Sequence, residues 1–117
     1  MRAPPKLTAR FFRTDAGNEP VREWLKALPS EERKTIGEDI LTVQYGWPIG
    51  MPLTRALGGG LHEVRSDLGG KRIARVIFVV EGDAAVLLHS FIKKTQKMPK
   101  QDLDLARQRL RRLRAVK

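Results

Sequence analysis

Apolar residues in the first half of the chain recur at helical spacing. They fall at intervals of three and four residues on both sides of Pro29, which places each group on one face of a helix. These apolar positions are Val21, Trp24, Leu25, Leu28, Ile36, Ile40 and Val43. Gly46-Trp47-Pro48 ends the second group, because glycine and proline rarely continue a helix. The pattern predicts a hairpin of two helices, with Asn18 and Ser30 as N-caps.

Strand-like runs precede and follow this hairpin. Residues 7–13, which include two adjacent phenylalanines, are expected to form a first strand. Three further runs, 61–66, 71–80 and 84–92, are separated by two short turns rich in glycine and aspartate. Turns of this length join antiparallel neighbours, because parallel strands need a long crossover. The second half therefore predicts an antiparallel meander.

Residues 46–60 and the C-terminal region complete the outline. Residues 46–60 contain five glycines and two prolines, which predicts a surface loop. Its triple glycine lacks the Lys-Ser/Thr and the preceding strand of a phosphate-binding loop, so we interpret it as a flexible entry to the next strand. After residues 93–100 a last helix is expected, with Leu103, Ala106, Leu110 and Leu113 on one face.

The element order β-α-α-β-β-β-α is typical of an α+β fold. We expect an antiparallel sheet of about four strands, an N-terminal helical hairpin and a C-terminal helix, with the helices on one face of the sheet. The 117 residues form a single domain, 1–117, that buries a core without a disulfide. The chain has no cysteine, which excludes cysteine-based metal sites. No apolar run approaches the ~20 residues that span a bilayer, and the N-terminal segment lacks a signal peptide's apolar stretch, so a cytoplasmic protein is expected.

Charge is distributed unevenly along the chain. Lysine and arginine number 23 against 13 acidic residues, a net charge of +10. Residues 1–60 contain 9 basic and 7 acidic side chains, whereas residues 61–117 contain 14 and 6. A net charge of +8 in one half favours a polyanionic partner such as a nucleic acid over a merely solubilising charge. A membrane surface is not expected, because no basic segment has an apolar face beyond what the core uses.

Polar residues inside the predicted strands mark a candidate site. Alternate residues of a strand share a face, so Glu63 and Arg65 lie on one face, with His62 and Val64 on the other. Arg75 interrupts the apolar run of the neighbouring strand, and the intervening turn brings it alongside Arg65. Two arginines with too few carboxylates attract an anion such as phosphate. The alternative is that Glu63 pairs with one arginine and solvent screens the other.

The last predicted strand leads into a basic segment. Lys93, Lys94 and Lys97 follow it within five residues, and lysines gathered at a strand end bind phosphate as point charges. A lysine with a lowered pKa can also donate a proton. A solvated exit loop has the same composition, so Lys97 fits both interpretations. His89, within the strand, is either a core residue or a proton donor.

The strands and the last helix together resemble a known family, the phage-derived HigB-like branch of the RelE/ParE toxin superfamily. The similarity extends from about residue 10 to about residue 110 and depends on the order and spacing of the segments rather than on any single one. Arg65 and Arg75 match arginines of the family's central strands, and Lys93 with Lys94 matches its basic pair. Ala74 stands where the family usually has tyrosine. The similar segments are residues 46–48, 51–53, 61–65, 72–78, 87–97 and the helix around Ala106.

The resemblance implies a function. Members typically cleave mRNA, often on the ribosome, and a cognate antitoxin with a helix-turn-helix domain neutralises them. This implies a metal-independent endoribonuclease, an mRNA interferase that needs no cofactor and inhibits translation. The catalytic candidates are Arg65, Arg75, Glu63, Lys93, Lys94 and His89, and the RNA-binding candidates are Lys71, Arg72, Lys97 and Lys100.

The reaction expected is attack of a 2′-hydroxyl on the adjacent phosphorus, with arginines holding the phosphate, Glu63 as base, and a lysine or His89 as acid. Substitution Arg75→Ala is expected to abolish cleavage and leave the fold intact. Two alternatives remain at this point. The first is a ParE-like toxin that inhibits DNA gyrase, and the second is a non-catalytic nucleic-acid-binding module.

Overall fold

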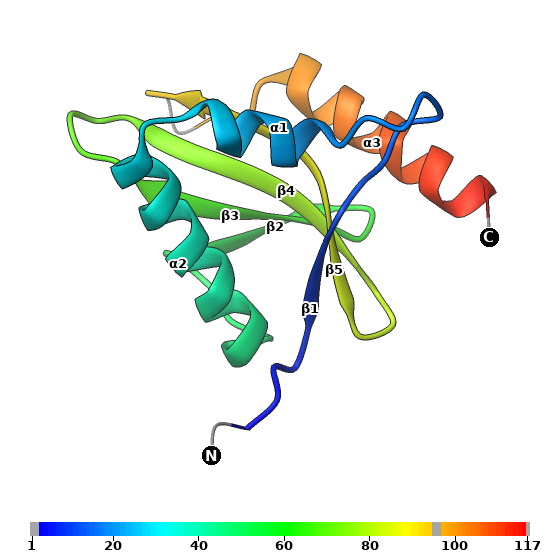
Figure 1. Cartoon of the computed structure of the whole chain (residues 1–117), viewed down its shortest axis with the longest axis horizontal. Helices are drawn as coiled ribbons and strands as arrows, with labels where there is room; N and C mark the ends of the chain where they lie inside the picture. Colours follow the sequence, from blue (N-terminus) through cyan, green and yellow to red (C-terminus); the bar gives the residue numbers. More distant parts are fainter. Residues whose placement is uncertain (1–2, 95–96, 117) are drawn as a thin grey trace.

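A computed structural model describes residues 3–94 and 97–116, and it contains one strand, β2, that the sequence did not predict (Figure 1). Thr95 and Gln96, part of the basic segment predicted after the last strand, lie outside the described residues. The elements in chain order are β1 (Thr8–Phe11), α1 (Pro20–Ala27), α2 (Ser30–Gly46), β2 (Thr54–Gly58), β3 (Leu61–Asp67), β4 (Ile73–Glu81), β5 (Ala84–Lys93) and α3 (Lys100–Ala115).

The strands form one mixed sheet in the order β1-β5-β4-β3-β2. Strands β2 to β5 are an antiparallel meander, as predicted, but β1 pairs in parallel with β5. The expectation of about four antiparallel strands was therefore wrong in both count and direction. The connection from β1 to β5 is long, containing α1, α2 and three strands, and this length permits the parallel pairing. The segment interpreted as a surface loop contains β2, whose alternation is too short and glycine-rich to predict a strand.

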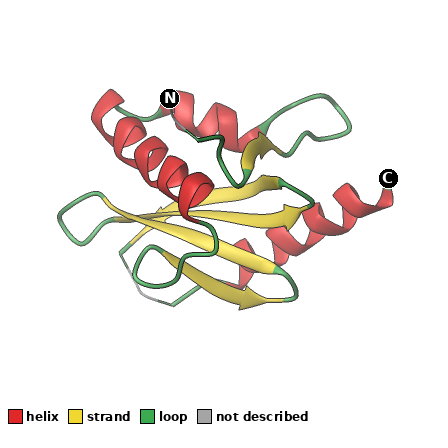
Figure 2. Cartoon of the chain, turned by 90° about the horizontal axis from the view of Figure 1, so that it is seen from below, coloured by secondary structure: helices red, strands yellow, loops and turns green. Residues whose placement is uncertain are grey.

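Helices cover both faces of the sheet rather than one. One core lies between the sheet and α1 with α2, and its buried residues include Val21, Ile36, Val76 and Phe78. A second core lies on the opposite face, where Ala106 and Leu110 of α3 pack on the sheet. Figure 2 shows the sheet between these layers. The prediction of helices on one face was wrong because alternation in the central strands is lost when both faces are buried.

The predicted helical stripes are confirmed by burial, but the predicted caps are not. Val21, Ile36, Ile40 and Val43 are all buried. The N-caps are Glu19 and Pro29, and neither makes a side-chain capping hydrogen bond in the described structure. The backbone N–H of Asn18 instead donates to the hydroxyl of Thr14, within the turn before α1. No helix among the described residues has the length and apolar composition needed to cross a membrane.

A β-bulge in β5 sets the direction of His89. Ile77 is opposite His89 and Phe78 is opposite Leu87, so Leu88 is the extra residue between them. Leu88 belongs to the core under α3, and so does Ile77. Because of the bulge, the side chains of His89 and Leu88 lie on the same face of the sheet, the face that α3 covers. In a regular strand these two neighbours would lie on opposite faces.

Candidate phosphate-binding site

Three arginines surround one carboxylate on the α3 side of the sheet. Arg65 of β3 is directly opposite Arg75 of β4, and Glu63 is opposite Arg55 of β2. The Oε1 atom of Glu63 lies 3.4 Å from Nε of Arg65 and 3.9 Å from Nη1 of Arg75. Its Oε2 atom accepts a hydrogen bond of 3.3 Å from Nη2 of Arg55. The predicted proximity of Arg65 and Arg75 is confirmed, and we call these four residues the arginine cluster.

The arginine cluster is graded from buried to exposed. The side chains of Glu63 and Arg75 have no exposed surface, whereas 11% of Arg65 and 31% of Arg55 is exposed. Burial lowers the pKa of Arg75, and the nearby guanidiniums of Arg65 and Arg55 lower it further, against the opposing effect of Glu63. Three cations around one anion leave a formal excess of +2, which favours the binding of a further anion at the exposed end.

Burial of Arg75 changes the expected result of substituting this residue. A guanidinium with no exposed surface, beside an equally buried carboxylate, is part of the core. Removing one partner from such a group leaves uncompensated buried charge. Substitution Arg75→Ala is therefore expected to destabilise the fold rather than to leave it intact.

Arg55 was missed by the sequence interpretation. Its position matters only because β2 pairs with β3 and brings Arg55 opposite Glu63. The only sequence signal that could have identified Arg55 is weak, because it is a single basic residue in a segment rich in glycine and proline.

A second polar group links β5 to α3. Nε2 of His89 lies 2.6 Å from Oδ1 of Asp102, near the start of α3. Arg109 donates a 2.7 Å hydrogen bond to the carbonyl oxygen of Leu88, and the same nitrogen lies 3.5 Å from Nδ1 of His89. Burial lowers the pKa of Arg109. The sequence interpretation missed Asp102 and Arg109, because helix spacing alone does not show which strand residue a helix contacts.

The two groups lie on the same face of the sheet. Glu63, Ile77 and His89 are successive partners across β3, β4 and β5, so about two strand spacings, or ~10 Å, separate the backbones of Glu63 and His89. In the next row Phe91 is opposite Arg75, and its ring stacks on that of His89 with centroids 5.6 Å apart. The arginine cluster and the His89 group therefore lie on one face of the sheet, linked through the buried ring of Phe91.

The predicted lysines are dispersed around the arginine cluster and the His89 group. Lys93 and Lys94, at the end of β5, are exposed, and Lys93 is opposite Ile73 in the row after Arg75. Lys71 and Lys97 are also exposed, whereas Lys100 forms an ion pair with Asp104 one turn along α3. These lysines are accessible to a polyanion.

Arg72 occupies a different environment. Its Nη1 and Nη2 atoms donate hydrogen bonds of 2.5 and 3.3 Å to the Glu32 carboxylate of α2. The pair raises the pKa of Arg72 and lowers that of Glu32. Arg72 thus connects the end of the β3–β4 turn to the helical hairpin, on the side away from α3.

This arrangement supplies the groups needed for chemistry at a phosphate. Guanidiniums bind phosphate bidentately and offset the charge of a phosphorane, and a histidine beside a carboxylate is a common arrangement for proton transfer. Within residues 3–94 and 97–116, no group of three or more His, Asp or Glu residues is arranged to hold a metal ion.

One comparison with known proteins identifies a relationship. The model of a family described as phage-derived protein Gp49-like (DUF891) matches residues 23–111 of the chain. The matched region contains α2, all the strands from β2 to β5, most of α1 and most of α3, and therefore the whole arginine cluster and the His89 group. The search of curated proteins found no match.

Proposed function

The chain belongs to the phage-derived Gp49-like family of RelE-like toxins, and we propose that it is the mRNA-cleaving toxin of a type II toxin–antitoxin pair. The observation that carries the proposal is the excess of two positive charges in the arginine cluster, beside a histidine paired with a carboxylate. Family membership makes an antitoxin the expected partner.

The proposed reaction is a transesterification within RNA. The 2′-oxygen loses its proton to a base and forms a bond to the adjacent phosphorus, and the bond from phosphorus to the 5′-oxygen breaks. The leaving 5′-oxygen takes up a proton, and the products are a 2′,3′-cyclic phosphate and a 5′-hydroxyl. Such a reaction needs cations near the phosphorus and groups that transfer protons, and it needs no metal ion.

Exposure divides the roles within the arginine cluster. Arg65 and Arg55 have exposed surface, so they are the guanidiniums that contact the phosphate. Glu63 and Arg75 have none and act as positioning residues that hold the other two. This assignment differs from the sequence-based hypothesis, in which Glu63 was the base, because a carboxylate without exposed surface does not reach a 2′-hydroxyl.

His89 is the residue proposed to transfer protons. Asp102 lies beside Nε2 and Arg109 lies beside Nδ1, and together they fix the orientation of the ring, which is proposed to exchange a proton with the RNA. Lys93 and Lys94 extend from the same strand, where they bind the flanking phosphates and serve as an alternative acid. Lys71, Lys97 and Lys100 are proposed to extend the contact along the RNA. The ribosome is proposed as the setting of the cleavage, which accords with the family resemblance and the strongly basic surface.

The product ends test this mechanism. The purified chain is incubated with ribosomes carrying a defined mRNA, and the 3′ ends of the fragments are examined for a cyclic phosphate. We expect cyclic phosphate with the wild type, and losses of about 100-fold in rate for Arg65→Ala and His89→Ala. Arg107→Ala, an exposed arginine of α3, serves as the control and should keep the wild-type rate. Fragments ending in a 3′-hydroxyl, or full activity of both site variants, would refute the mechanism.

A further inference from the structure

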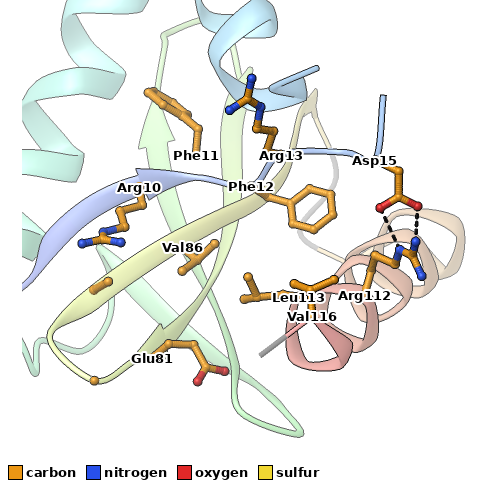
Figure 3. Close-up of a pocket in the computed structure, with 12 residues that line it drawn as sticks. Arg10, Phe11, Phe12, Arg13, Asp15, Glu81, Val86, Arg112, Leu113 and Val116 are labelled. Atoms are coloured by element: carbon orange, nitrogen blue, oxygen red, sulfur yellow. Dashed lines mark hydrogen bonds and ion pairs between the residues drawn. The ribbon is translucent and has the colours of Figure 1, made fainter. Parts of the chain in front are cut away.

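A pocket of about 580 Å³ lies between β1, the start of β5 and the C-terminal end of α3, away from the arginine cluster. Figure 3 shows Phe12, Val86, Leu113 and Val116 around this pocket, with Arg10 and Arg13 at its edge. Val116 is 70% exposed and contributes to the apolar lining. The pocket therefore combines an apolar floor with a basic rim.

A second pocket of about 490 Å³ adjoins the first. The two share Phe12, Asp15 and Arg112, and the second continues along α3 past Leu105 and Arg109. Together the two adjoining pockets form a groove beside α3. We call it the α3 groove.

The carboxylates at the α3 groove are already paired. Both oxygens of Asp15 accept hydrogen bonds from Arg112, and Glu81 accepts one of 3.1 Å from Nε of Arg114. The pairing with Asp15 raises the pKa of Arg112. With these two pairs neutral, Arg10 and Arg13 leave the rim of the first pocket with a net positive charge, and Arg111 adds to it in the second. The complementary partner is therefore acidic as well as apolar.

We propose that the α3 groove binds a peptide segment of a partner protein that carries apolar and acidic side chains on one face. The apolar side chains would cover Phe12, Leu113 and Val116, and the carboxylates would meet Arg10 and Arg13. RNA is the less suitable occupant, because phosphates would use the rim but leave the aliphatic floor uncovered. If the proposed function holds, the antitoxin is the protein that supplies the segment.

The α3 groove also reaches the His89 group without covering the arginine cluster. Arg109 lines its second pocket and lies 3.5 Å from Nδ1 of His89. A segment seated there contacts Arg109 directly, so it changes the surroundings of His89 from the side of α3. This effect on cleavage depends on the proposed function, whereas the binding itself does not.

The test uses the isotope-labelled full chain and three synthetic peptides of equal length. One carries Glu and Leu at helical spacing, one carries Lys and Leu, and one carries Glu and Ser. In an NMR titration we expect only the Glu/Leu peptide to shift the backbone amides of residues 11–13, 84–86 and 112–116. Arg10→Glu and Arg13→Glu should each weaken its binding about fivefold, since each reverses one exposed charge pair. The matched control Arg107→Glu, on the same helix but outside both pockets, should leave it unchanged.

Three results would overturn the proposal. These are no binding of the Glu/Leu peptide, shifts of residues outside the α3 groove, and binding of the Glu/Leu peptide no tighter than that of the Lys/Leu peptide. Shifts of the same amides by single-stranded RNA instead of the peptide would assign the groove to RNA. Because peptide binding is measured without cleavage, its failure and the failure of the proposed function are observed separately.

Discussion

Arg65 and Arg75 are direct cross-strand partners in β3 and β4, and one oxygen of Glu63 lies within 3.9 Å of both guanidiniums. Like charges in opposed positions destabilise a sheet unless an anion lies between them. Glu63 is that anion, and Arg55 adds a third cation to the same carboxylate. The arrangement holds Arg65 near the surface in a fixed orientation. The three arginines repel one another, and a bound phosphate would offset this repulsion.

Substitution Glu63→Gln should destabilise the protein strongly. It removes the only negative charge of the arginine cluster and leaves buried Arg75 beside two other cations. We expect a loss of about 3 kcal/mol in the free energy of unfolding, measured by urea denaturation. Glu38→Gln, in an exposed pair with Lys34, is the control and should change the free energy by less than about 0.5 kcal/mol. Equal stabilities of the two variants would contradict the assigned role of Glu63.

Arg75→Ala and Arg65→Ala should separate stability from activity. Arg75 is fully buried, so its removal should cost about 3 kcal/mol or more of unfolding free energy through lost pairing and an empty volume. Arg65→Ala removes a partly exposed cation, so it should lower the free energy of unfolding clearly less than Arg75→Ala does. Relative to this small loss of stability, its loss of cleavage activity should be larger. Urea denaturation and cleavage rates measured on the same samples test this. A stable, inactive Arg75→Ala would return Arg75 to direct contact with RNA.

Arg72 and Glu32 offer a test of structural against RNA-binding roles. If Arg72 serves to connect the β3–β4 turn to α2, Arg72→Ala and Glu32→Ala should lower the melting temperature to similar extents, and the double variant should be no worse than either. Cleavage rates should be unaffected in all three. Slower cleavage in Arg72→Ala but not in Glu32→Ala would show that Arg72 contacts RNA, as the sequence suggested.

His62 should make stability depend on pH. Its ring packs against those of Trp47 and Phe78, with centroids 4.9 and 5.5 Å away, and burial lowers its pKa below the ordinary value of 6.5. The unfolded chain therefore binds a proton at His62 more readily than the folded protein does. Stability is retained above pH 6.5 and falls as the pH decreases toward the lowered pKa.

Substitution His62→Phe tests this dependence. It should preserve the aromatic contacts and flatten the change in unfolding free energy between about pH 5 and about pH 7. The variant is compared with the wild type by urea denaturation at each pH. An unchanged slope would assign the dependence to other groups.

The sequence predicted the part of the site that depends on strand register. Arg65 and Arg75 follow from one short turn and a period of two, both of which are local properties. Arg55 did not follow, because β2 forms by pairing with β3 and has little apolar alternation of its own. An edge strand that is specified by such long-range pairing carries little periodic signal of its own.

The His89 group shows a second limit. A single bulge residue, Leu88, decides which face His89 occupies, and strand alternation predicts the opposite face beyond such a bulge. Asp102 and Arg109 become partners of His89 only because α3 crosses the sheet on that face. The predicted basic character of the C-terminal half was correct, but several of its charges are engaged in pairs that hold α3 in place.

The measurement that tests the central claim most directly is primer extension on abundant transcripts after induced expression in cells. The wild type is compared with Arg65→Ala, His89→Ala and the exposed control Arg107→Ala, at matched protein levels. We predict growth arrest and new 5′ ends within coding regions for the wild type and the control, and neither for the two site variants. Arrest by the wild type without new 5′ ends would contradict RNA cleavage and point to a target such as DNA gyrase.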